Sequence, residues 1–102
     1  MYKIGVLEDF ITTVSKVNEE YVVKYSKGEF TGECRYKMME LMGTNKPIRQ
    51  TPMLLTHCNM GDIIEKIHLE HTLSSEDFHS LSMEIREHSL LKLSEFMSVL
   101  DK

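Results

Sequence analysis

The chain has little of several residue types, and each shortage excludes a class of protein. It has no tryptophan, two prolines, two cysteines and five glycines among 102 residues, which excludes collagen-like repeats, low-complexity disorder and a disulfide-rich scaffold. No apolar run approaches the ~20 residues that a membrane-spanning helix needs. No phosphate-binding loop, dinucleotide-binding glycine motif or zinc-protease motif occurs. The sequence therefore predicts one small domain that does not enter a membrane and carries no cofactor.

Positive charge is also scarce. Twelve Lys and Arg face sixteen Asp and Glu, which gives a net charge of −4. Non-specific binding to duplex DNA depends on a cationic surface, so we expect no binding of this kind. The imbalance lies in residues 51–102, where four basic and nine acidic residues give −5, whereas residues 1–50 carry eight and seven.

Two cysteines, Cys34 and Cys58, are too few for a disulfide framework. The short apolar run of residues 4–7 ends at two acidic residues and does not resemble a secretory leader. We therefore expect reduced thiols that fill the core as small apolar groups, in a cytoplasmic protein.

Apolar spacing favours helices along most of the chain. From residue 7 to residue 25 the apolar positions recur at steps of three and four, which is typical of a core-facing helical stripe. The fold class predicted is all-α, an irregular four-helix bundle whose C-terminal helix is the longest. The alternative is an α+β fold with a β-hairpin at 20–36, because that stretch is rich in β-formers. The helices expected in the bundle are 5–26, 31–42, 52–71 and 74–100.

The last predicted helix has the clearest start. Ser74 and Asp77 have the spacing of an acidic capping box. Polar residues, among them His88 and Ser89, interrupt its main apolar stripe. This gap predicts contacts that fix the register of the helix or, as the alternative, the lining of a binding site. Its length is ~40 Å, whereas a compact chain of this size is ~33 Å across, so the helix should extend beyond a monomer.

A second apolar stripe on this helix predicts self-association. Met83, Leu90 and Met97 are spaced seven residues apart, on a face distinct from the main stripe. An apolar strip left in water is unusual in a soluble monomer, so we expect a symmetric homodimer that covers it. The proline-containing loop that precedes residue 52 presents Lys46 and Arg49 as further candidates for partner contacts.

Two alternatives to protein binding come from other residue clusters. Residues 21–37 interleave aromatic and basic side chains, as in sites that stack bases and hold phosphates. This predicts a site for a nucleotide or short oligonucleotide that comprises Lys24, Lys27, Arg35, Tyr36 and Lys37. Separately, helical spacing places Glu65, His68 and His71 within reach of one metal ion, which predicts a His/Glu metal-binding bundle.

The leading functional hypothesis is a non-enzymatic interaction protein. No nucleophile motif surrounds either cysteine. A short, acidic chain that is poor in motifs is typical of adaptors and of inhibitors encoded by phages or mobile elements. The sequence therefore favours a cytoplasmic regulator or inhibitor that binds a protein partner and performs no chemistry.

Overall fold

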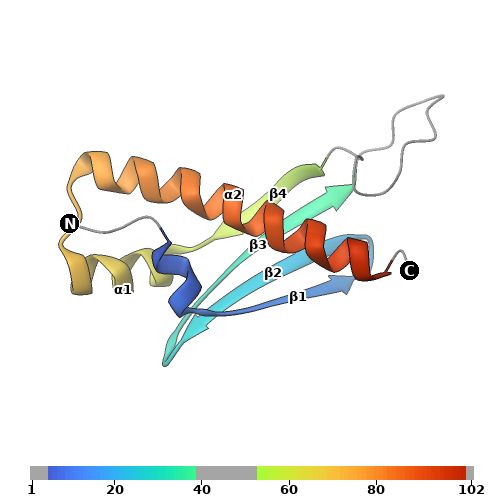
Figure 1. The fold of residues 1–102 in the computed structure, drawn as a ribbon, viewed down its shortest axis with the longest axis horizontal. Coiled ribbons are helices and arrows are strands. Elements are labelled where there is room, and N and C mark those ends of the chain that lie inside the picture. Colours follow the sequence, from blue (N-terminus) through green and yellow to red (C-terminus); the bar gives the residue numbers. More distant parts are fainter. Residues whose placement is uncertain (1–4, 39–52, 101–102) are drawn as a thin grey trace.

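The computed structural model describes residues 5–38 and 53–100, which form an antiparallel sheet followed by two helices (Figure 1). The fold class is therefore α+β, and the predicted all-α four-helix bundle is wrong. The alternative hairpin at 20–36 is confirmed, because β2 and β3 pair along their whole length. The elements in chain order are a 3-10 turn at Val6–Asp9, β1 at Ile11–Val17, β2 at Glu20–Lys27, β3 at Phe30–Met38, β4 at Met53–Asn59, α1 at Gly61–His71 and α2 at Ser75–Leu100.

The four strands form a meander in which each strand pairs with its neighbours in the chain, in the order β1-β2-β3-β4. Two-residue turns join the first three strands. Each turn begins with a residue in the left-handed region, Asn18 at φ 58° and Gly28 at φ 64°. Asparagine and glycine tolerate this conformation better than other residues, which explains why the chain reverses at these points.

The predicted helices at 5–26 and 31–42 are both wrong within the described residues. Their apolar period arises because two strands with alternating patterns follow one another, and the reversal at Asn18 shifts the second pattern. Val14 on β1 pairs with Val23 on β2, and β-branched side chains of this kind pack well in sheets. Strand pairing therefore determines the structure of this segment. The helical spacing of its apolar residues is not accompanied by a helix N-cap.

The predicted helix at 52–71 is two elements. Its first part is β4, and its second part is α1, with the boundary at Met60. Glycine interrupts regular helices, and the junction between strand and helix lies directly before Gly61. Backbone hydrogen bonding of the helix begins when Ile64 N–H donates to the Met60 carbonyl at 2.9 Å.

The predicted C-terminal helix is confirmed as α2, with the expected cap. Ser74 N–H donates to Asp77 Oδ2 at 3.0 Å, and Asp77 N–H donates to Ser74 Oγ at 3.2 Å. These reciprocal bonds satisfy two backbone donors that the first turn of a helix otherwise leaves unpaired.

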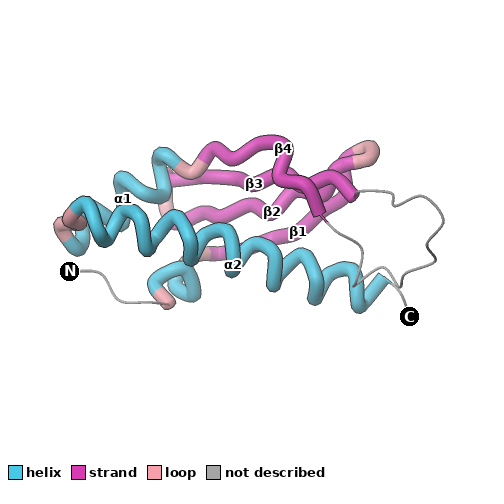
Figure 2. Tube along the Cα trace, turned by 90° about the horizontal axis from the view of Figure 1, so that it is seen from above, coloured by secondary structure: helices cyan, strands magenta, loops and turns pink. Residues whose placement is uncertain are grey.

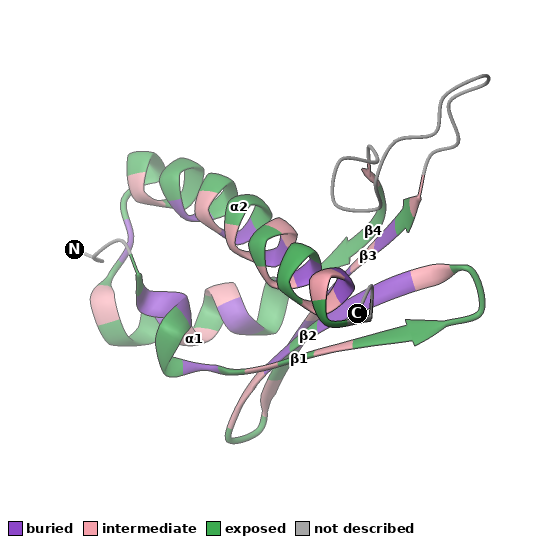
Figure 3. Cartoon of the chain, turned by 45° about the vertical axis from the view of Figure 1, so that its right-hand side comes forward, coloured by how far each residue is buried: buried purple, intermediate pink, exposed green. Residues whose placement is uncertain are grey.

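Both helices cover the same face of the sheet (Figure 2). The helix α2 packs over β1 and β2, whereas α1 packs over β2 and β3. The buried side of α2 faces the strands, and its opposite side is open to solvent (Figure 3). The core between them is apolar with several tyrosines, and its largest members are Tyr25, Tyr36, Leu7, Ile63, Ile67, Leu81, Leu93 and Met97.

The molecule is elongated, with principal extents of 47 × 26 × 20 Å. The 26 residues of α2 span about 39 Å, and the helix runs along the longest axis (Figure 1). The longest extent of the molecule exceeds the length of α2, so the length of the helix gives no reason to expect a second copy.

At Gly32, β3 and the start of α1 approach each other so closely that a side chain does not fit. A Cβ at Gly32 would lie 2.7 Å from Met60 Sδ, 2.8 Å from Ile63 Cγ1 and 3.1 Å from the Asn59 carbonyl oxygen. We expect Gly32→Ala to lower the free energy of unfolding by about 1–3 kcal/mol. Urea unfolding followed by circular dichroism measures the change. The matched control is Gly61→Ala, whose Cβ would meet no atom within 4 Å among the described residues; equal losses in the two variants would contradict the prediction.

Candidate functional site

Strand β4 forms one edge of the sheet and carries apolar side chains that are open to solvent. Its outer side has no neighbouring strand among the described residues. Leu54 and Leu55 are 51% and 37% exposed, and the strand contains no Lys, Arg, Asp or Glu. Soluble proteins ordinarily protect such edges with charge, proline or a bulge, and of these β4 has only a bulge. The outer edge of β4 is therefore a surface on which another extended chain can pair.

A β-bulge fixes the middle of β4 against its neighbour. The register of the β3–β4 pair shifts between Arg35 and Tyr36, which leaves Thr56 as the extra residue. The Thr56 hydroxyl lies 3.3 Å from the Arg35 carbonyl, to which it donates, and it also contacts the Glu20 carboxylate on β2. Both partners lie on the sheet side of β4, so its outer backbone edge takes no part in these contacts.

The face of the sheet away from the helices carries charges that compensate one another. Arg35 Nε lies 2.5 Å from Glu33 Oε2, and Arg35 Nη1 lies 3.9 Å from Glu20 Oε1. The hydrogen bond from Arg35 lowers the pKa of Glu33 below its usual value and raises the pKa of the guanidinium. Arg35 is therefore already paired within the sheet.

The residues predicted to bind a nucleotide are divided between the two faces of the sheet, with Tyr36 and Lys27 on the side of the helices. Tyr36 is 1% exposed and faces the helices, where it cannot stack on a base. Lys27 pairs with Glu70 of α1 at 3.5 Å, whereas Lys24 and Lys37 are exposed. The predicted set does not form one site in this conformation, and nucleotide binding stays a prediction.

The residues predicted to bind a metal are also not assembled. His68 Nδ1 accepts a hydrogen bond from the Leu73 backbone N–H at 2.9 Å, which engages this imidazole at the end of α1. Glu65 and His71 belong to the same helix. Within residues 5–38 and 53–100, no group of three His, Cys, Asp or Glu side chains is placed to hold a metal ion. His68 instead has a structural role as part of the turn between the helices.

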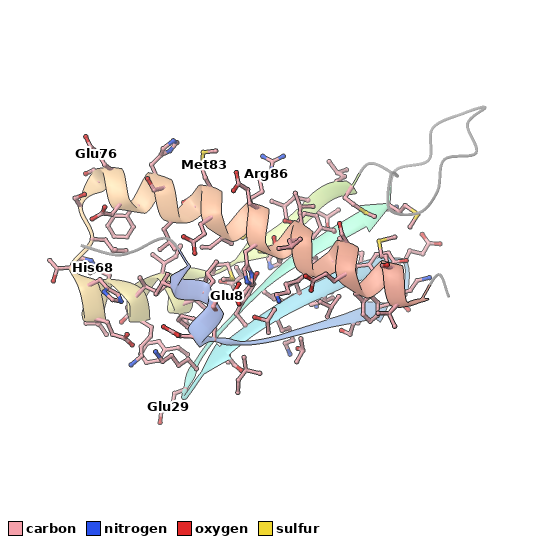
Figure 4. All side chains as sticks on the ribbon, viewed as in Figure 1. Glu8, Glu29, His68, Glu76, Met83 and Arg86 are labelled. Atoms are coloured by element: carbon pink, nitrogen blue, oxygen red, sulfur yellow. The ribbon has the colours of Figure 1, made fainter. Side chains whose placement is uncertain are left out.

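The predicted partner-binding strip is divided between the surface and the core. Met83 is 52% exposed and points away from the sheet (Figure 4). Leu90 is half-buried against the core, and Met97 is 2% exposed within it. The predicted contacts Lys46 and Arg49 lie outside the described residues. The three apolar side chains cannot face one partner together, and self-association stays a prediction.

Two sets of hydrogen-bonded polar side chains lie between α2 and the sheet. Tyr36 Oη lies 2.6 Å from Ser89 Oγ. Tyr25 Oη lies 2.7 Å from His88 Nδ1, and His88 Nε2 lies 3.1 Å from Glu8 Oε1. Burial raises the pKa of both tyrosines. These contacts agree with the predicted role of the polar residues on α2 in fixing its register.

The two cysteines are direct neighbours across β3 and β4. Cys34 pairs with Cys58 in the strand register, and their Sγ atoms are 3.3 Å apart. Cys34 is 1% exposed, as expected for a core filler, whereas Cys58 is exposed. Burial is the main cause that raises the pKa of the Cys34 thiol, and a hydrogen bond with Ser89 opposes it. Apolar spacing did not reveal this pair, because it predicted the two residues on different helices.

Apolar spacing did not reveal β4 as an edge strand either. The apolar residues of 53–59 fit the helical spacing of the isoleucines that follow in α1, so both segments were assigned to one helix. The seven residues between Pro52 and Met60 have the usual length of a strand, and that length was the available signal.

Comparisons with known proteins assign no family. No protein-family model, no curated protein and no solved structure matches this chain. Among the described residues, neither helix is long and apolar enough to cross a membrane. What the site can do therefore follows from its own residues and their geometry.

Proposed function

We propose that this chain is a non-enzymatic interaction protein, and that β4 receives an extended segment of its protein partner. The observation that carries the proposal is the outer edge of β4, which is exposed, uncharged and seven residues long. Strand addition at such an edge gives affinity through backbone hydrogen bonds and specificity through alternating side chains. The cytoplasmic location expected from the sequence is part of this proposal.

The side chains of β4 indicate the chemistry of the partner segment. Leu54 and Leu55 are consecutive, so they point to opposite faces of the sheet. An added strand would contact one leucine on each face. Because β4 has no formal charge to compensate, the complementary segment is extended and apolar or neutral along its length. A charged side chain opposite either leucine would lose hydration without gaining a partner.

The burial of the titratable groups supports a role without chemistry. The side chains with the most raised pKa values are Tyr25 and Cys34, and each is 1% exposed. Catalytic groups with shifted pKa values ordinarily line a cleft that a substrate can enter. Here the shifts arise from packing between helix and sheet.

Charge on the edge strand tests the proposal. We expect Leu54→Lys with Leu55→Lys to weaken partner binding at least about tenfold, which corresponds to 1.4 kcal/mol or more, because lysines protect sheet edges from pairing. Affinity capture from host lysate identifies the partner, and titration with that purified partner measures the loss. Hydrogen exchange should show protection of the β4 amides in the complex.

The matched control places the same charges on α2. Met83 and Leu91 are 52% and 55% exposed, so Met83→Lys with Leu91→Lys adds equal charge away from the edge strand. This control should bind as the wild type does. The proposal fails if both double variants bind equally well, or if protection maps to α2. A dimer that dissociates only in the β4 variant would instead assign the edge to a second copy of the chain.

A further inference from the structure

We propose that Cys34 and Cys58 form a redox-active dithiol, which a small disulfide such as oxidised glutathione converts into a disulfide between β3 and β4. This inference concerns a modification site and does not depend on which partner binds the edge. It rests on the register of the two strands, the distance between the sulfur atoms and the unequal exposure of the two residues.

The strand register brings the two thiols into bonding geometry. Residues directly opposite in an antiparallel pair have Cα atoms about 4.5–5.5 Å apart, which lies within the range that disulfides span. Cys34 and Cys58 are such a pair, and their Sγ atoms are already 3.3 Å apart. A disulfide therefore requires rotation of two side chains and no movement of either strand.

The unequal exposure of the cysteines gives the reaction an order. Cys58 is exposed on the edge strand, so a dissolved disulfide can reach its sulfur. Cys34 is 1% exposed, so a dissolved disulfide does not reach its sulfur, whereas Cys58 Sγ lies next to it. Cys58 is therefore the attacking residue, and Cys34 is the resolving residue.

The two exchange steps balance without a further reactant. The Cys58 thiolate attacks one sulfur of oxidised glutathione, forms a mixed disulfide and releases one glutathione thiolate, which takes up a proton. Cys34 then gives up its proton, attacks Cys58 Sγ and displaces the second glutathione. The two cysteine thiols are oxidised, the glutathione disulfide is reduced, and the two thiol protons end on two molecules of glutathione.

The disulfide would tie the exposed edge strand to the core. In the reduced protein β4 is held by its pairing with β3 and by the contacts of Thr56, whereas the disulfide adds a covalent link between residues 24 positions apart. A link of this span restricts the unfolded chain more than the folded one. Oxidation should therefore raise the thermal midpoint and slow hydrogen exchange in β4.

Glutathione redox buffers test the proposal. The full chain is equilibrated in mixtures of oxidised and reduced glutathione, quenched with acid and measured by intact mass spectrometry. We expect a monomeric product that is lighter by two hydrogen atoms, carries no glutathione and has a Tm higher by about 10 °C. Dithiothreitol should reverse both changes.

Single-cysteine variants identify the two roles. Cys58→Ser should stay reduced while folded, because its remaining thiol is buried. Cys34→Ala should stop at the mixed disulfide and retain one glutathione on Cys58. The proposal is overturned if the wild type accumulates that mixed disulfide, forms a dimer linked through Cys58, or keeps both thiols in a fully oxidised buffer. The wild-type mass decides the question even if Cys34→Ala does not fold.

Discussion

Replacing Met97 with glutamate is expected to unfold most of the protein at room temperature. Met97 is 2% exposed and packs in the core between α2 and the sheet. Loss of a buried methionine side chain alone costs about 2–5 kcal/mol. A carboxylate in the same place must also be desolvated or protonated. The sum is comparable with the whole stability of an ordinary domain, about 5–15 kcal/mol. Far-ultraviolet circular dichroism and a urea titration measure the loss.

The same substitution at Met83 is the matched control. Met83 is also on α2, but its side chain is 52% exposed and points away from the sheet. Met83→Glu should change the free energy of unfolding by no more than about 0.5 kcal/mol, as surface substitutions usually do. Equal stability of the two variants would mean that Met97 is not in the core. If the wild type and Met83→Glu are both monomers in solution, the exposed Met83 gives no reason to expect a dimer through this helix.

The sequence predicted α2 correctly because its local signals and its long-range packing agree. The capping box at Ser74 defines the start without help from the rest of the fold, and both of its hydrogen bonds are present. The buried positions Leu81, Ile85 and Leu93 then follow at steps of four or eight along one side of the helix. A long amphipathic helix with a strong cap needs no knowledge of its partner to be recognised.

The sheet was predicted only in part, as the alternative hairpin at 20–36, because most of its pattern belongs to pairs of strands. On β1 and β2 the core-facing residues alternate, and the turn at Asn18 joins the two series into a false helical period. The pairing Val14–Val23 that favours strands exists only after the chain has reversed. Within a single stretch of sequence, no intrinsic preference reveals that contact.

The candidate sites were unpredictable for a related reason. The juxtaposition of Cys34 with Cys58 depends on the pairing of β3 with β4, across an intervening segment of the chain. The exposure of β4 depends on where the helices lie, because α1 and α2 mainly cover the other three strands. Both features are properties of the assembled sheet, whereas the sequence shows only residue types and spacings.

Raising the pH above about 10 is expected to destabilise the protein steeply. Tyr25, Tyr36 and Cys34 are each 1% exposed, and burial raises the pKa of all three. In the unfolded chain these groups lose their protons near pH 8.5–10, whereas the folded chain holds them to higher pH. The folded state then binds more protons than the unfolded state, so stability falls as pH rises, by about 1.4 kcal/mol per pH unit for each group.

Urea unfolding at intervals between pH 7 and pH 11.5 measures this slope, and Tyr25→Phe isolates one group. The variant loses the hydrogen bond between Tyr25 and His88, so it should be less stable at pH 7 by about 1 kcal/mol. Above pH 10, however, the folded and unfolded states of the variant differ by one bound proton fewer than those of the wild type, because phenylalanine has no hydroxyl group. Its stability should therefore fall less steeply, and the difference from the wild type should shrink as pH rises. Parallel curves for the two proteins above pH 10 would show that the Tyr25 hydroxyl ionises as readily in the folded chain as in the unfolded one.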